Sequence, residues 1–320
     1  MSALKNRKTK SRCFAAVLLG AALLVSPGFC SLGLAASKGA RHFKQKVFSS
    51  PQLAVNAFIA ALKNKDAKEL RAILGAGSHD LIHSGDKVAD NQTRERALQM
   101  FAENNKIDQV SERKVVLDIG KDNWPFPIPI IKEKGKWHFD TREGRLEILN
   151  RRIGRNELEA IKCCEQYVKA QKAYASQIHD NSGVFEYAQK FISSPGKKNG
   201  LYWKTSEGGQ PSPLSAFMEN AIKIGYGAGE KGVFEGYHYK ILTGQGKNAQ
   251  DGAFSYIDKG KMTGGFAMIA YPAKYDVSGV MTFQVNNQGV VYQKDLGPKT
   301  ESRARAVKLF NPDKSWSIVK

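Results

Sequence analysis

Residues 150–175 read NRRIGRNELEAIKCCEQYVKAQKAYA, and this stretch decides the fold of the second half of the chain. Apolar residues recur in it at helical spacing in two neighbouring stripes: Leu158, Ile161, Cys164 and Val168, and Ala160, Cys163, Tyr167, Ala170 and Tyr174. Two adjacent stripes make an apolar arc wider than a surface helix needs, so we expect a sheet to cover it. Asn156 and Glu159 form an N-x-x-E pair typical of a capping box, which predicts that the helix begins near residue 156.

The adjacent cysteines, Cys163 and Cys164, lie on this apolar arc. A disulfide requires Cα atoms roughly 4.4–6.8 Å apart, whereas neighbouring Cα atoms are only about 3.8 Å apart. A bond between the two would be strained and would break the helix. Because buried cysteine behaves as a small hydrophobe, we expect both thiols to be reduced core residues. The alternative is a catalytic thiol, which needs an open basic setting and a positioned histidine, and His179 is the nearest in sequence.

Strands are expected downstream at YHYKIL (237–242), at FAMIAY (266–271) and in a hairpin over residues 279–295 that turns at residues 286–289. One long helix on such a sheet resembles the soluble headgroup of type IV pilins and pseudopilins. This resemblance implies a pilin-headgroup-like α+β domain over residues 156–320. Pilins polymerise through an apolar N-terminal extension of that helix, whereas here a polar stretch and a whole domain precede it.

The first half of the chain, residues 48–141, shows helices first and strands later, which predicts an α+β fold. Helices are expected from Ser50-Pro51, from the Asp66 and Glu69 pair, and through RERALQMFAEN (94–104). Strands are expected at KVVLDI (114–119) and in a hairpin over residues 128–140 that turns at residues 133–136. SSPQLAVNAFIAALKNKDAKELRAIL and the later GKWHFDT are similar to the NTF2-like cone fold, which implies a small-ligand pocket or a dimer module.

Residues 142–157 join the two predicted domains. We expect a rigid junction here, with a network of charged residues: Asp140, Arg151, Arg152, Arg155 and Glu157. Apolar residues interrupt the charges at near-helical intervals, so one side of the segment is expected to be buried: Leu146, Ile148, Leu149 and Ile153. A solvated linker helix is the alternative.

Residues 1–36 have a basic head, an apolar run from Cys13 to Phe29 and a small-residue exit, which together predict a cleaved secretory signal peptide. An uncleaved anchor is the alternative. The segment carries five positive charges and no acid, so its removal lowers the formal net charge from +19 to +14. Export to the periplasm or beyond makes nucleic acid an unexpected partner. The basic excess is explained by a solvated surface, or by attraction to anionic envelope polymers or lipid headgroups.

Two short motifs partly match the patterns of metal-binding sites. HDLIH (79–83) spaces two imidazoles as the zinc-protease motif does, but Asp80 replaces its glutamate, and third ligands such as Asp86 or His238 are distant. We therefore expect a short surface helix with solvated His79 and His83, and no metal. DNSGVFEY (180–187) predicts a polar turn that starts a helix, with Glu186 closing it, rather than a calcium loop.

The tryptophans are the candidate ligand-binding residues. Aromatic rings can stack on sugars or line a pocket, and those considered are Trp124, Trp137 and Trp203, with Tyr202 beside the last. The alternative is that these rings fill the core, as aromatic side chains usually do. Nucleotide-binding glycine motifs and the G-x-S-x-G nucleophile motif are absent from the sequence.

Taken whole, the chain resembles a bacterial secreted family catalogued as domain of unknown function 2950. The stretches that carry this resemblance are NWPFPIPIIK, FDTREGRLEILNRRIGRNELEAI, FEYAQKFISSPGKKNGLYW and SGVMTFQVNNQGVVYQKDLGP. The family has no assigned activity, so the resemblance implies an architecture and a compartment but no reaction. We expect a non-enzymatic binding or structural module of the cell envelope, without a cofactor, whose partner is an anionic polymer or another envelope protein. The alternative is a hydrolase or metal-dependent enzyme that uses the N-terminal pocket.

Overall fold

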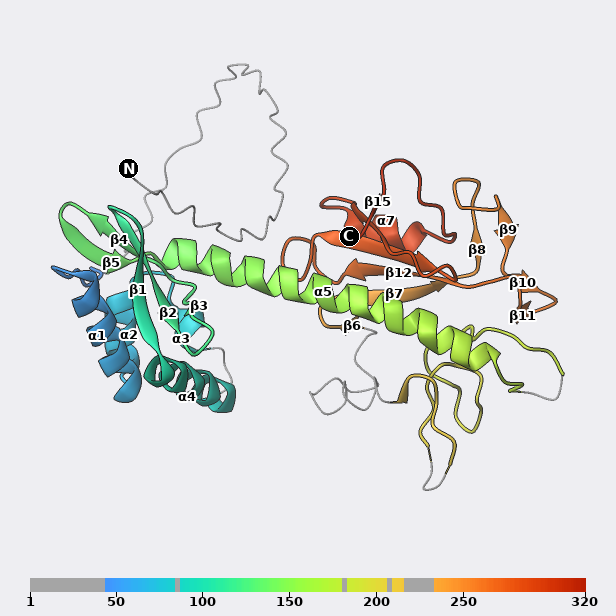
Figure 1. Ribbon diagram of the computed structural model, residues 1–320, viewed down its shortest axis with the longest axis horizontal. Helices are drawn as coiled ribbons and strands as arrows, with labels where there is room; N and C mark the ends of the chain where they lie inside the picture. The colour runs from blue at the N-terminus through green and yellow to red at the C-terminus, as the bar shows by residue number, and fades with distance from the viewer. Residues whose placement is uncertain (1–43, 84–86, 180–182, 206–208, 216–232) are drawn as a thin grey trace, which may run out of the picture. The chain divides into compact units, whose positions relative to one another are not determined.

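The computed structural model describes residues 44–83, 87–179, 183–205, 209–215 and 233–320 (Figure 1). The expected signal peptide lies outside these residues. Helices and antiparallel sheets make up the described chain, so the predicted α+β class is confirmed at that level. None of the described helices is both long enough and apolar enough to cross a membrane.

The N-terminal half places four helices before a five-stranded antiparallel sheet. The helices are α1 (Pro51–Lys63), α2 (Ala67–Leu74), α3 (His79–Ile82) and α4 (Lys87–Glu103). The strands are β1 (Asn105–Ser111), β2 (Lys114–Ile119), β3 (Trp124–Pro125), β4 (Ile130–Glu133) and β5 (Lys136–Phe139). They are ordered β1-β2-β4-β5, with β3 paired to β2. The expected helix starts are confirmed, since Ser50 accepts a bond from the Leu53 amide and Asp66 from the Glu69 amide.

The core of this half lies between the helices and one face of the sheet. Strand β2 alternates, so that Val115, Leu117 and Ile119 point into the core while the residues between them are half exposed. Phe58 of α1 packs between two other rings, with its centroid 5.4 Å from that of Phe126 and 5.2 Å from that of Phe139. Burying these side chains is the main stabilising contribution to this half.

A single 35-residue helix, α5 (Thr141–Ala175), connects the two halves in sequence. Its N-cap is Asp140, whose carboxylate accepts a hydrogen bond from the Glu143 amide at 2.9 Å. The prediction that the helix begins near residue 156 is therefore wrong. Asp140 and Glu143 form an earlier capping pair, and no proline follows to stop the helix. Asn156 is instead buried within the helix and donates to the Ser278 carbonyl at 2.9 Å.

The C-terminal half is built on a six-stranded antiparallel sheet, ordered β15-β14-β13-β12-β7-β6. Its strands are β6 (Val233–Phe234), β7 (Tyr237–Leu242), β12 (Ala267–Pro272), β13 (Met281–Asn286), β14 (Tyr292–Asp295) and β15 (Ser317–Ile318). Short ladders pair β8 (Gly244–Gln245) with β9 (Phe254–Ser255) and β10 (Ile257–Asp258) with β11 (Lys261–Met262). The predicted strands and the hairpin over residues 279–295 are confirmed.

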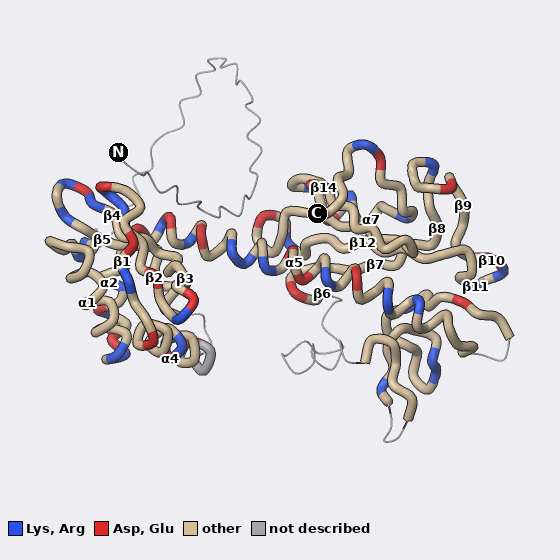
Figure 2. Tube along the Cα trace, viewed as in Figure 1, with Lys and Arg blue, Asp and Glu red and all other residues tan. Residues whose placement is uncertain are grey.

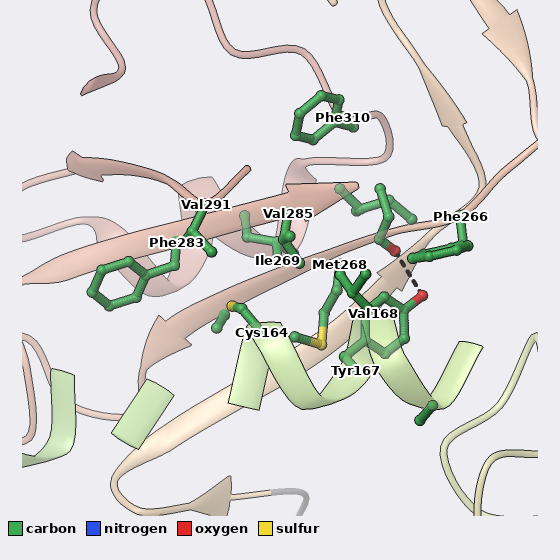
Figure 3. Packing of buried hydrophobic residues seen from close by; sticks show 14 of the residues in the cluster. Cys164, Tyr167, Val168, Phe266, Met268, Ile269, Phe283, Val285, Val291 and Phe310 are labelled. Carbon is green, nitrogen blue, oxygen red and sulfur yellow. Dashed lines mark hydrogen bonds between the residues drawn. The ribbon is translucent and has the colours of Figure 1, made fainter. Parts of the chain in front are cut away.

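The second half of α5 covers one face of this sheet. Figure 3 shows Cys164, Tyr167 and Val168 of the helix against Met268 of β12 and its neighbours on β13. The Tyr167 hydroxyl donates to the Ala267 carbonyl at 3.2 Å. Both cysteines are reduced and buried, as predicted.

Two polar contacts fasten the same part of α5 to the first residue of β13 and the residue before it. The Glu157 carboxylate accepts bonds from the Val280 and Met281 amides at 2.9 and 3.0 Å. Gly236 lies so close to the Asn156 amide that an added Cβ would be 2.6 Å from its nitrogen.

A short helix, α7 (Thr300–Ala306), packs on β12. Lys240 of β7 pairs with Ile269, so by strand alternation it points away from the face that carries Met268. Its ammonium donates to the carbonyls of Ala304 and Arg305 at 3.1 and 2.7 Å, and to that of Val307. The lysine therefore satisfies the free carbonyls at the end of α7.

The segment expected to start a helix after DNSGVFEY does not do so. Residues 180–182 lie outside the described chain, and residues 183–186 are irregular. Tyr187 forms a single bridge with Met262, and Glu186 pairs with Lys261 at 3.0 Å. The prediction is wrong because Glu186 binds a distant strand instead of closing its own turn.

Candidate functional site

An open pocket of about 420 Å³ lies where the loop after α2 meets the first turns of α5. It is lined by Ala76, Gly77, Arg142, Arg145 and Leu146, and we call it the arginine pocket. Ala76 and Gly77 are exposed at the tip of the loop.

Hydrogen bonds from side chains to backbone carbonyls fix the loop that forms one wall of this pocket. Gly75 ends α2 in a left-handed conformation (φ +83°), which a residue with a side chain would adopt only with strain. The buried Ser78 hydroxyl donates to the Gly75 carbonyl at 2.7 Å, and the Thr141 hydroxyl donates to the Leu74 carbonyl at 2.6 Å. The Gln45 amide donates to the carbonyls of Ile73 and Leu74 at 2.9 and 3.0 Å. These hydrogen bonds therefore hold the loop in a fixed position.

The two arginines form the other wall, one helical turn apart on α5. Arg145 Nη1 donates to the Gly77 carbonyl at 2.6 Å and lies 3.6 Å from the Asp80 carboxylate. Its side chain is still 46% exposed. Arg142 is exposed and makes no hydrogen bond or ion pair with any residue that the structure describes. One guanidinium is thus anchored, and the other is available to a ligand.

This arrangement suits an anionic ligand. A guanidinium presents several N–H donors in one plane and can bind a carboxylate or phosphate in a bidentate manner. Basic residues in the first turn of a helix are disfavoured by the helix dipole by about 0.3–1 kcal/mol each. Arg142 occupies such a position, and no described residue forms a hydrogen bond or ion pair with it in compensation.

His79 and His83 lie on and just after α3, the short helix expected there. Both are exposed, with ring centroids 5.5 Å apart, and His79 Nδ1 lies 3.4 Å from the Asp80 carboxylate. Asp86 lies outside the described residues, and His238 lies on β7. Across the described ranges, no three His, Cys, Asp or Glu side chains are grouped to hold a metal ion.

The three candidate tryptophans lie on separate elements and do not line one pocket. Trp137 is 8% exposed in the N-terminal core. Trp124 is 41% exposed on β3, under the Arg151 guanidinium at 4.5 Å. Trp203 packs against the C-terminal core, and its indole donates to the Gln210 carbonyl at 3.3 Å.

The five charged residues expected to form one junction network make separate contacts instead. Arg151 binds Glu147 at 2.7 Å and the Pro125 carbonyl at 2.8 Å, on the N-terminal side. Asp140 caps α5 and Glu157 binds the loop before β13. Arg152 and Arg155 are exposed, with no ion pair to any described residue. Basic and acidic residues are interspersed along α5 (Figure 2).

The apolar residues of the junction are less buried than expected. Leu146 is 56% exposed, and Ile148, Leu149 and Ile153 are half-buried. The expectation of a buried side was therefore wrong, because the described chain covers these side chains at most in part. Within α5, all of which the structure describes, no residue between Gly144 and Asn156 is buried.

The cysteines lie in an environment that suppresses thiol reactivity. Burial raises the pKa of Cys163 to about 12, despite a hydrogen bond with Tyr239 that favours the thiolate. Burial likewise raises the pKa of Cys164. His179, considered as a catalytic partner, instead stacks on Tyr174 at 3.8 Å and bonds to its carbonyl at 2.8 Å. The geometry favours the packing interpretation of these thiols.

A family model described as Protein of unknown function (DUF2950) matches residues 45–319. The chain belongs to this family. The curated proteins contain no significant match to it, and neither do the solved structures. Membership of the DUF2950 family therefore supplies no activity, and the function of the site is inferred from the chemistry of its residues.

Sequence reasoning on this DUF2950 protein did not single out Arg142 and Arg145 as a site. Both arginines lie within residues 142–157, the segment predicted to be a charged junction. Nothing in the sequence indicates that Gly77 lies beside them. One signal was present. Asp140 and Glu143 mark a helix start, and a start at residue 141 puts Arg142 in the first turn, where a cation opposes the helix dipole.

Proposed function

We propose that this protein is an exported, non-enzymatic binding module of the bacterial cell envelope that holds an anionic group in the arginine pocket. The observation that supports this proposal is Arg142, an exposed guanidinium without a described partner, beside the positioned Gly77 loop and the anchored Arg145. An anionic envelope polymer is the partner class that fits the net positive charge of the chain.

The architecture that presents this pocket has two proposed parts. Helices followed by an antiparallel sheet support an NTF2-like domain over residues 48–141. A long helix on an antiparallel sheet supports a pilin-headgroup-like domain over residues 156–320, and we propose residues 142–157 as a rigid junction. Export itself is tested by the first residue of protein recovered from the native host. A start near Ser37 supports export, whereas a start at Met1 contradicts cleavage.

An enzymatic role is the second candidate, because His79 and Asp80 lie beside the pocket and are 3.4 Å apart. A hydrolase of this kind would need a nucleophile or an activated water. Ser78 is the adjacent hydroxyl, but it is buried and donates to the Gly75 carbonyl. We therefore favour binding over hydrolysis.

Calorimetric titration of the chain from residue 37 with polyphosphate, and separately with polygalacturonate, tests the binding proposal. The variant R142Q removes a guanidinium that forms no hydrogen bond or ion pair with a described residue, so the fold should be retained. R142Q/R145Q should weaken binding by about tenfold or more, because each charged hydrogen bond contributes about 1.5–3 kcal/mol.

The matched control is R152Q/R155Q, which removes the same charge from exposed positions on the same helix. It should change affinity by less than about threefold, through long-range electrostatics alone. Equal losses in the two double variants would show that net charge, and not the arginine pocket, attracts the polymer. Release of phosphate or cleavage of the polymer would favour the enzymatic candidate.

A further inference from the structure

Strand β1 is a free edge of the N-terminal sheet. In the described chain it pairs only with β2, and six of its seven residues are exposed. An edge strand presents unpaired backbone N–H and C=O groups that can pair with another strand. Figure 1 shows β1 and β2 among the strands of this half.

The side chains of β1 fall into two sets. Residues Asn105, Ile107 and Gln109 pair with Ile119, Leu117 and Val115, which face the core. Lys106 and Asp108 alternate with them and pair with Asp118 and Val116 on the opposite face. The solvent face of the edge therefore carries one cation and one anion, two residues apart.

Two copies of one strand can pair antiparallel about a two-fold axis only in certain registers. Residues that lie directly opposite each other in the pair must point to the same face of the sheet. This is possible only when the two-fold axis passes between the two copies of one residue, so that this residue lies opposite itself. An axis at Lys106 places two lysines opposite each other, and an axis at Asp108 places two aspartates opposite each other. An axis at Ile107 places Lys106 of each copy opposite Asp108 of the other.

We infer that β1 pairs antiparallel with β1 of a second copy of this chain, centred on Ile107. The two opposite-charge pairs in this register stabilise it, whereas the neighbouring registers bring like charges together. A register shift between Gln109 and Ser111 distorts the end of the strand, so the pairing extends over Asn105–Gln109.

A second copy fits this edge better than an unrelated peptide. A charged residue on an edge strand ordinarily discourages pairing. Here Lys106 is followed at the second position by Asp108, so the charge pattern is complementary to itself. This inference is independent of the arginine pocket.

Sedimentation equilibrium of the chain from residue 37 measures the association. The wild type should show a concentration-dependent dimer. The single variants K106D and D108K each replace two attractive pairs by two like-charge pairs, and each should weaken dimerisation by roughly tenfold or more. D108K is the cleaner of the two, because K106D adds a carboxylate beside Asp118, whose pKa is already raised by burial and by Asp108.

Charge exchange separates the specific register from general effects. The double variant K106D/D108K restores opposite charges in every pair and should dimerise like the wild type. A mixture of K106D with D108K should form mixed dimers that are tighter than the dimers of either variant alone. Thermal unfolding of each variant confirms that the monomer is folded. A wild type that stays monomeric at the highest concentration reached, or a dimer unchanged by D108K, would overturn the inference.

Discussion

The two ends of α5 are fastened to their sheets by different kinds of contact. The first turns are held by hydrogen bonds and one close approach. Thr141 and Arg145 donate to loop carbonyls, Arg151 donates to Pro125, and Gly144 lies against Ile128. Thr141 is buried, but the side chains of Arg145 and Arg151 stay in contact with water, so this end leaves room for an open pocket.

The later turns of α5 are held by buried apolar side chains. Ala160, Cys164 and Tyr167 are at most 2% exposed beneath the C-terminal sheet. Close packing of this kind leaves few voids larger than a water molecule. The comparison teaches that one helix can serve as a packed core element at one end and as a ligand-presenting element at the other.

The comparison is tested most strongly by Tyr167→Ala at the apolar end. Deleting a fully buried aromatic ring should cost about 3–5 kcal/mol, because a cavity remains in the core. Tyr167→Phe keeps the ring and loses only the hydroxyl bonds to Ala267 and Gln171, so it should cost about 1 kcal/mol. Denaturant unfolding measures both. A loss below about 1 kcal/mol for the alanine variant would mean that the apolar contacts are not what holds this end.

A glycine pair on the same helix tests the close approach at the polar end. A Cβ added at Gly144 would be 2.6 Å from Ile128 Cγ1, whereas one added at Gly154 would meet nothing within 4 Å. Gly144→Ala should therefore destabilise the protein by about 1–3 kcal/mol through overpacking. Gly154→Ala should stabilise it by up to about 1 kcal/mol, because alanine is the better helix former. Thermal melts of both variants measure the difference, and equal shifts would contradict the description of this end.

The smallest expected effect concerns the buried thiols. Because burial raises the folded pKa of Cys163 from 9.0 to about 12, the thiol stays neutral in the folded chain while it ionises in the unfolded chain. Its contribution to stability is therefore complete below about pH 9 and is lost as the pH rises toward 12. Between about pH 8 and 10, the wild type should lose more stability than C163A/C164A.

Iodoacetamide labelling is a second test, which measures the reactivity of the same thiols. Both should react slowly in the folded protein at pH 8 and both should react after unfolding, because the thiolate is the nucleophile. Rapid labelling of the folded protein, or identical pH dependence in C163A/C164A, would show that the thiols are more open than the structure places them.

Much of the fold follows from local sequence signals. The Ser50 and Asp66 caps, the strand KVVLDI and the hairpin over residues 279–295 each combine a periodic apolar pattern with a turn or cap of known chemistry. Periodicity also predicted most of the buried face of α5 after residue 156, although Leu158, which was expected on it, is 59% exposed. These signals act over a few residues, so a single sequence reveals them.

The parts that sequence reasoning missed depend on distant partners or on weak patterns. Strand β1 was not expected, because its side chains are almost all exposed and alternate little in hydrophobicity. The start of α5 was placed too late because Asn156, which resembles a cap, is bound to Ser278 in a distant loop. The arginine pocket needs Gly77 and Arg145 together, and 68 residues separate them.

The two ends of α5 also differ in when their contacts can form as the chain emerges. Thr141 and Arg145 bind residues that precede them by 67 and 68 positions, so their partners already exist when the helix appears. Tyr167 and Glu157 bind residues 100 and 123 positions later. The apolar stripe of α5 therefore remains exposed until strands β12 and β13 have been synthesised. Transiently exposed apolar surface is prone to aggregation. Folding order, as much as final stability, thus makes this stripe the segment most in need of protection during biogenesis.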